Sequence, residues 1–252
     1  MRRALVILGS LVACSGDDGK DVDADTGTAI GDDDDATTSG DDDDSSGDDD
    51  DDALTALDVL LVVDDSASMG PNQDAFADEV GGLVDGLSER GIDASYAVVT
   101  TTSSQLVEGM PVTEAADLSR LVRVGVDGDD LEQGLSMAVA AADGAWRRGV
   151  PLVVVGITDE EDCSHGGMLD GHPGDDCYLR PELLIPTADL LAGLEAAAPG
   201  VRVFGFNSGV DDPGCDSFLS ERWATVAGAT GGQVFPLCTD LAGSLQGLVD
   251  AL

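Results

Sequence analysis

The stretch Asp58-Val-Leu-Leu-Val-Val-Asp-Asp-Ser-Ala-Ser-Met69 decides the fold of this chain. Its apolar run, Val59 to Val63, is typical of a parallel strand that is buried on both faces. The run breaks off at Asp64, and two hydroxyls follow at alternate positions, Ser66 and Ser68. The carboxyl end of such a strand opens into the crevice where α/β sheets bind ligands. These side chains form a hard, oxygen-only donor set, which suits Mg²⁺, Mn²⁺ or Ca²⁺ better than Zn²⁺. The plainer interpretation is that Asp64 and Ser66 only cap the helix that follows.

The remainder of residues 54–252 alternates between strand and helix patterns. Strands are expected at Ala94–Thr100, Leu118–Val124, Pro151–Thr158, Val201–Asn207 and Gln233–Leu237. Helices are expected at Pro71–Leu87, Leu131–Trp146, Pro186–Ala198, Phe218–Ala229 and Asp240–Leu252. The alternation predicts an α/β domain with a doubly wound, mostly parallel sheet and helices on both faces.

Three regions resemble the von Willebrand factor A (vWA) family. The motif Asp64-x-Ser66-x-Ser68 at a strand end resembles the metal-ion-dependent adhesion site (MIDAS) of that family. The sequence Ile157-Thr-Asp159 is similar to the Thr-Asp that follows the family's fourth strand. The passage from Trp223 to Phe235, with Gly231-Gly232 at its turn, looks like the family's last helix-to-strand junction. The resemblance covers nearly all of residues 57–252 and implies a Rossmann-like vWA fold.

The same resemblance implies roles for the site residues. Ser66 and Ser68 would bind a divalent cation directly, whereas Asp64 and Asp159 would bind it through water. Mg²⁺ is the ion expected first, with Mn²⁺ and Ca²⁺ as alternatives. An acidic residue of a protein partner would fill the open coordination position.

One element departs from the family pattern, because the usual third hydroxyl, a Thr before the central helix, is missing. The corresponding loop reads Asp127-Gly-Asp129-Asp130. Asp129 or Asp130 could cap the helix, with Glu132 or Gln133 completing a capping box. Alternatively, Asp129 could replace the hydroxyl at the ion. Such a carboxylate would hold the cation more tightly but would leave less attraction for an acidic partner.

The N-terminus has the pattern of a targeting segment. Arg2-Arg3 precede a short apolar run, and the run ends in Leu11-Val-Ala-Cys14, which resembles the lipobox of bacterial lipoproteins. The resemblance implies a signal peptide over residues 1–13, a lipidated Cys14 and, because Ser15 follows, an outer-membrane lipoprotein attached through its lipid anchor. The alternative is an ordinary secretory signal with an incidental cysteine.

Residues 14–53 are low in complexity and strongly acidic, with Asp runs at 32–35, 41–44 and 48–52. With almost nothing apolar to bury, this segment is expected to be a disordered linker. A specific calcium module is the alternative, although no run has the spacing of a calcium-binding loop. The formal net charge of −40 argues against nucleic acid as a partner, because phosphates would be repelled.

Four cysteines besides Cys14 indicate two disulfides in an exported chain. The pairs expected from proximity in sequence are Cys163–Cys177 and Cys215–Cys238. A zinc site made by the first pair with His165 and His172 is an alternative, and Cys163 with His165 as a nucleophile pair is another.

We therefore expect a non-enzymatic binding module that recognises a protein partner through its cation, in adhesion or surface assembly. The alternatives are an envelope scaffold with a structural or vestigial ion site, and a metal-dependent hydrolase. Against the hydrolase, the chain lacks a Walker loop, a Gly-x-Ser-x-Gly elbow and a His-Glu-x-x-His motif.

Overall fold

The computed structural model describes residues 54–144, 146–207 and 220–252. Within these residues, five strands form one sheet in the order β2-β1-β3-β4-β5, and every pairing between neighbours is parallel. The strands are β1 (Ala56–Val63), β2 (Asp93–Thr100), β3 (Leu152–Ile157), β4 (Arg202–Asn207) and β5 (Val234–Pro236). The α/β class and the parallel sheet are confirmed, and the apolar strand β1 is an interior strand that pairs with β2 and β3.

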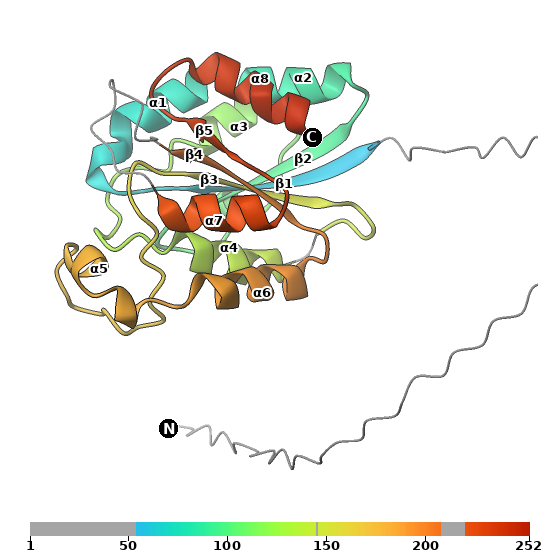
Figure 1. Cartoon of the computed structure of the whole chain (residues 1–252). Helices are drawn as coiled ribbons and strands as arrows, with labels where there is room; N and C mark the ends of the chain where they lie inside the picture. Colours follow the sequence, from blue (N-terminus) through green and yellow to red (C-terminus); the bar gives the residue numbers. More distant parts are fainter. Residues whose placement is uncertain (1–53, 145, 208–219) are drawn as a thin grey trace, which may run out of the picture. The chain divides into compact units, whose positions relative to one another are not determined.

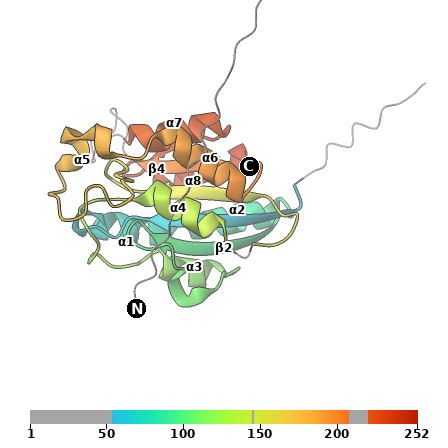
Figure 2. The ribbon, with the colours of Figure 1, turned by 90° about the horizontal axis from the view of Figure 1, so that it is seen from below.

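Helices cover both faces of this sheet, so the fold is doubly wound (Figure 1). One layer consists of α1 (Gly70–Glu79), α2 (Gly81–Glu89), α3 (Ala115–Leu121) and α8 (Leu241–Ala251). The other layer consists of α4 (Gly134–Ala142), α6 (Thr187–Ala197) and α7 (Glu221–Ala229), as Figure 2 shows. The short helix α5 (Asp176–Leu179) lies beyond the carboxyl ends of the strands (Figure 1). Short 3₁₀ helices occur at Ala67–Met69, Val107–Gly109 and Pro181–Leu183.

The strand expected at Leu118–Val124 is wrong, because its first residues lie in helix α3. The buried residues Leu118, Leu121 and Val122 are three and four positions apart, which is the spacing of one helix face. At the edge strand β2, Tyr96 instead forms an isolated antiparallel bridge with Val112. The apolar density of the segment was therefore a poorer guide than its period.

Strand β1 separates two hydrophobic cores. Val59, Leu61 and Val63 pack into the core beneath α1, α2 and α8, whereas Leu60 and Val62 pack into the core beneath α4, α6 and α7. This alternation is the period of two that a strand imposes on its side chains. Burial of both sets explains why the run is apolar throughout.

A glycine in β3 makes room for the largest core side chain. A Cβ atom at Gly156 would lie 2.7 Å from the ring of Trp223. Trp223 is fully buried against the sheet, so any larger residue at position 156 would force it to move.

The predicted helices differ from the observed ones mainly at their ends. The helix expected at Pro71–Leu87 divides at Val80 into α1 and α2, where Gly81 and Gly82 are poor helix formers. The helix expected at Leu131–Trp146 begins later, at Gly134. In the described part of the chain, no helix is both long and apolar enough to cross a membrane.

Because the strands are parallel, their carboxyl ends meet at one edge of the sheet. The backbone continues the ladder there, since Asp64 N donates to Ile157 O (2.9 Å) and Thr101 N donates to Val63 O (3.1 Å). The polar residues that follow β1, β2 and β3 are thereby placed next to one another.

Candidate metal site

Asp64 is the first residue after β1, and its carboxylate is fully buried. Its Oδ1 accepts a hydrogen bond from Ser66 N (2.8 Å), and its Oδ2 accepts one from the Thr158 hydroxyl (2.7 Å). Burial raises the pKa of Asp64, while the hydrogen bond from Thr158 opposes that rise. The carboxylate is thus held in one orientation by residues from two neighbouring strands.

Three further predicted residues are joined to one another by hydrogen bonds. The hydroxyl oxygens of Ser66 and Ser68 are 3.1 Å apart, and the Ser68 hydroxyl donates to Asp159 Oδ1 over 3.1 Å. Asn72 Nδ2 donates to Asp159 Oδ2 over 3.4 Å. The structure therefore brings Asp64, Ser66, Ser68 and Asp159 together at the ends of β1 and β3.

A buried glutamine and a second aspartate attach the neighbouring loop to this cluster. Gln73 Nε2 donates to the carbonyls of Asp64 (2.8 Å) and Gly125 (2.7 Å). Gly128 N donates to Asp65 O over 2.7 Å, and a Cβ atom at Gly128 would lie 2.6 Å from that same oxygen. The close backbone approach explains why a glycine stands at this position.

Asp65 connects the end of β1 to the end of β2. Its carboxylate accepts hydrogen bonds from the hydroxyls of Thr101 (2.9 Å) and Thr102 (2.6 Å). The Asp65 carboxylate is thereby engaged with the residues that follow β2.

Asp129, the suggested substitute for the missing Thr, lies on the exposed loop. Its Oδ1 accepts a weak hydrogen bond from Leu131 N (3.4 Å). The predicted capping box is wrong, because α4 begins at Gly134 with Gln133 as its N-cap residue and no side-chain cap from it. The first turn of α4 is satisfied instead from a distant loop, by Asp162 and Ser164, which accept from Leu135 N (2.8 Å) and Ser136 N (2.9 Å).

The sequence indicates Glu132 only as a capping-box residue and does not identify it as a candidate site residue. Its side chain is only 1% exposed, and neither carboxylate oxygen has a hydrogen-bond partner among the described residues. Burial, followed by the negative charge of Asp64, raises the pKa of Glu132 to about 9. The Thr101 hydroxyl lies near enough to oppose this rise, but it donates to Asp65.

The carboxylates on the β3 side of the cluster are also perturbed. Burial and the charge of Asp64 raise the pKa of Asp159 to about 6. Burial and the charge of Asp159 raise the pKa of Glu160 to about 7. Such shifts mark a crevice that is short of positive charge.

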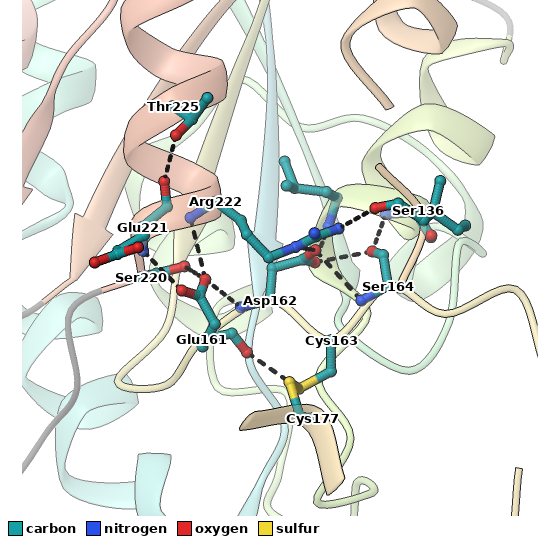
Figure 3. Close-up of polar contacts among 12 residues, drawn as sticks. Ser136, Glu161, Asp162, Cys163, Ser164, Cys177, Ser220, Glu221, Arg222 and Thr225 are labelled. Carbon is teal, nitrogen blue, oxygen red and sulfur yellow. Dashed lines mark hydrogen bonds and ion pairs between the residues drawn. A yellow bond between two sulfur atoms is a disulfide. The ribbon is translucent and has the colours of Figure 1, made fainter. Parts of the chain in front are cut away.

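The residues after Asp159 are fixed by polar contacts to α4 and α7 (Figure 3). Glu161 accepts hydrogen bonds at the start of α7 from the Ser220 hydroxyl (2.7 Å) and from Glu221 N (2.9 Å). Asp162, whose side chain is completely buried, forms an ion pair with Arg222 of α7 at 2.9 Å. The loop beside the cluster is therefore anchored to two helices.

The disulfide predicted between Cys163 and Cys177 is confirmed, with a Cα–Cα distance of 5.5 Å (Figure 3). Because both thiols are consumed, the zinc site and the Cys163–His165 nucleophile pair are wrong. His165 Nδ1 accepts from Gly167 N (3.0 Å) and Leu169 N (3.2 Å), while His172 pairs with Asp176 at 2.7 Å. The predicted Cys215–Cys238 bridge lies outside the described residues, because Cys215 does.

The cluster fits a hard divalent cation by its chemistry. In the described ranges, no three His, Cys, Asp or Glu side chains converge as a ready-made metal group. The donors are instead the paired hydroxyls of Ser66 and Ser68 and the oriented carboxylates of Asp64 and Asp159. Oxygen ligands completed by water are typical of Mg²⁺ and Ca²⁺.

A pocket of about 460 Å³ opens beside the cluster. It is lined by Asp130, Glu160, Pro173, Gly174, Asp175 and Tyr178. The loop that carries α5 also exposes the apolar side chains of Met168, Tyr178 and Leu179. Of these three, Tyr178 also lines the pocket.

No family model matches the chain, and no curated protein matches it. Among solved structures, proximal thread matrix protein 1 (PTMP1) from the mussel byssus is similar over 79% of this chain, at 16% identity and a TM-score of 0.48. The chain spans 48% of that protein's length. An aerotolerance-related membrane protein from Bacteroides fragilis NCTC 9343, with multiple mutations to serines, is similar over 78% of this chain and 100% of its own, at 12% identity and a TM-score of 0.48. Both similarities are similarities of structure at low sequence identity.

Proposed function

We propose that residues 54–252 are a vWA-type domain that recognises a protein partner through a divalent cation. The observation that carries this proposal is the hydrogen-bonded chain Ser66–Ser68–Asp159 beside the buried Asp64. It stands at the carboxyl edge of a doubly wound parallel sheet, where such folds bind ligands.

The chain's own residues would prepare the site before the cation arrives. Thr158 and the backbone of Ser66 orient Asp64, and Asn72 orients Asp159. When bound, the cation would supply a positive coordination position that an oxygen of the partner can fill. An acidic side chain of the partner is the donor that the family resemblance implies.

The partner would also contact the loop that carries α5. This loop is held in place by its disulfide, by the buried ion pair with α7 and by contacts with α4. A loop that is ordered before binding loses less conformational entropy when a partner docks. The exposed side chains of Met168, Tyr178 and Leu179 would supply the apolar part of that contact.

A second candidate is an envelope scaffold in which the cation is structural. The burial of both Asp64 and Asp159 favours it, because deeply placed ligands leave little of the ion for a partner. We propose no enzymatic activity. Against the hydrolase alternative, the hydrogen bonds of His165 and His172 that the structure describes are formed within their own loop.

We place the protein in the bacterial cell envelope as an outer-membrane lipoprotein. The support is the sequence that ends at Cys14, which lies outside the described residues. The acidic residues between Cys14 and the domain would serve as a tether.

Calorimetric titration of the full chain with Mg²⁺, Mn²⁺ and Ca²⁺ tests the proposal. The control is the double variant Ser66→Ala with Ser68→Ala, which keeps the same acidic segment and therefore the same unspecific cation binding. We expect one saturable site that is present in the parent protein and absent from the variant. Ion-dependent capture of a purified partner candidate, reversed by a chelator, would then follow. Identical titration curves for the two proteins would refute the cation site.

A further inference from the structure

A buried carboxylate without a partner is costly, and Glu132 is one. Moving an ionised carboxylate out of water costs several kcal/mol unless a counter-charge or hydrogen bonds compensate. None of the ion pairs in the described ranges involves Glu132, and both of its oxygens lack hydrogen-bond partners there. Residues 208–219 contain no Lys, Arg or His, so that segment supplies no counter-charge either.

The backbone fixes Glu132 close to the end of β1. Gln133 N donates to Thr101 O over 3.2 Å, and Thr101 N in turn donates to Val63 O, the residue before Asp64. On the other side, Cys163 N donates to Glu132 O. Glu132 is therefore held between the residues that follow β2 and those that follow β3. The rise of its pKa under the charge of Asp64 agrees with that proximity.

The ordinary structural roles for this residue are already filled. Helix α4 begins after Glu132 and takes its first hydrogen bonds from Asp162 and Ser164. Leu131, the preceding residue, packs in a small apolar cluster with the disulfide. If Glu132 only filled space, an apolar side chain would do so at lower cost.

We propose that Glu132 is a direct ligand of the cation bound at Asp64, Ser66 and Ser68, taking over the role of the threonine that the preceding loop lacks, and that it makes the site selective for Ca²⁺ over Mg²⁺. The inference rests on the proposed function, because it concerns the same site. A carboxylate can bind a cation through two oxygens, and Ca²⁺ accepts six to eight oxygen ligands in flexible geometry. Mg²⁺ demands near-octahedral geometry and usually retains several waters, so it gains less from an added carboxylate.

The test is calorimetric titration of the full chain with Ca²⁺ and with Mg²⁺. The parent protein is compared with Glu132→Gln and with the conservative variant Glu132→Asp. Glu195→Gln, on the exposed face of α6, is the matched control because it changes the net charge equally. Circular dichroism and urea unfolding in chelator verify that each variant is folded.

We expect the parent to bind Ca²⁺ at least about 10-fold more tightly than Mg²⁺. Glu132→Gln should weaken Ca²⁺ binding by about 10- to 100-fold and reduce the preference, whereas Glu132→Asp should recover part of the affinity. Glu195→Gln should leave both constants unchanged. A folded Glu132→Gln protein with unchanged Ca²⁺ and Mg²⁺ affinities would overturn the inference about Glu132 and leave the proposed function standing. Absence of any saturable site in the parent would overturn the proposed function as well.

Discussion

Burial controls the chemistry of the individual carboxylates around Asp64. Asp159, Glu160 and Glu132 all bind their protons more tightly than the same groups do in an unfolded chain. A carboxyl whose native pKa is raised contributes stability that is fully present below its ordinary pKa. That stability is lost as the pH rises toward the native pKa. Without a cation, this cluster therefore destabilises the domain as the pH increases.

The pH dependence of stability should separate Glu132 from its neighbours. The pKa values of Asp159 and Glu160 are raised to about 6 and about 7, so these two groups change the stability of the domain mainly below pH 7. The pKa of Glu132 is raised to about 9, so the effect of Glu132 on stability continues up to about pH 9. In chelator, the parent protein should lose stability between pH 7 and 9, and Glu132→Gln should lose less. Urea unfolding at several pH values measures this, with Glu195→Gln as the control. Parallel curves for the parent and Glu132→Gln would contradict it.

The positions of Asp64, Ser66, Ser68 and Asp159 could be predicted because each follows a strand signal directly in the sequence. Glu132 could not be predicted in the same way. A glutamate three residues after Asp129 has the spacing of a capping box. Only the contact of α4 with Asp162 and Ser164, which lie far along the chain, shows that the helix begins later. A local pattern carries no information about such a contact.

At the scale of elements, the segment after β3 joins three parts of the molecule. Asp159 belongs to the cluster at the strand ends, Glu161 satisfies the first turn of α7, and Asp162 satisfies that of α4. The disulfide from Cys163 adds the loop that carries α5. The geometry of the site therefore depends on the buried pair between Asp162 and Arg222.

Removing the positive partner of that pair should be strongly destabilising. Arg222→Met leaves Asp162 buried without its counter-charge and should cost about 3 kcal/mol of unfolding free energy. Arg180→Met is the matched control, because Arg180 forms an exposed ion pair with Glu182 at 3.6 Å. This variant should lose less than about 1 kcal/mol of unfolding free energy. Urea unfolding of both variants checks the difference. Equal losses would show that the buried pair does not hold the loop.

The elements themselves were predictable where their period was clear. The strands around β1 alternate with amphipathic helices, so the doubly wound sheet follows from the pattern. The strand prediction at Leu118–Val124 fails because it follows the apolar content of the segment, whereas the spacing of its buried residues is that of helix α3. The antiparallel bridge at Val112 consists of a single residue pair, which is too short to leave a strand signal.

At the scale of the whole molecule, the sequence combines a lipobox-like N-terminus, an acidic segment and the α/β domain. The formal charge of −40 favours cations and basic surfaces as partners. Our proposal of a membrane-tethered domain that binds its partner through a cation rests on these features.

If Cys14 carries the proposed lipid anchor, the anchor should decide where the protein is found. In a bacterial host, the parent protein should partition with the membrane fraction and carry the lipid label, whereas Cys14→Ala should carry no label and should keep its signal segment as an unprocessed precursor. Membrane fractionation with metabolic lipid labelling measures both. A Cys14→Ala protein that still fractionates with membranes and carries label would refute the lipoprotein assignment.

The central claim is that the residues after β1 hold a divalent cation. Diffraction from crystals grown with Mn²⁺, recorded for its anomalous signal, tests this most directly. We expect one strong peak within bonding distance of the Ser66 and Ser68 hydroxyls and the Glu132 carboxylate, and no such peak in crystals of the variant Ser66→Ala with Ser68→Ala. A domain without a peak at this place under saturating Mn²⁺ would contradict it.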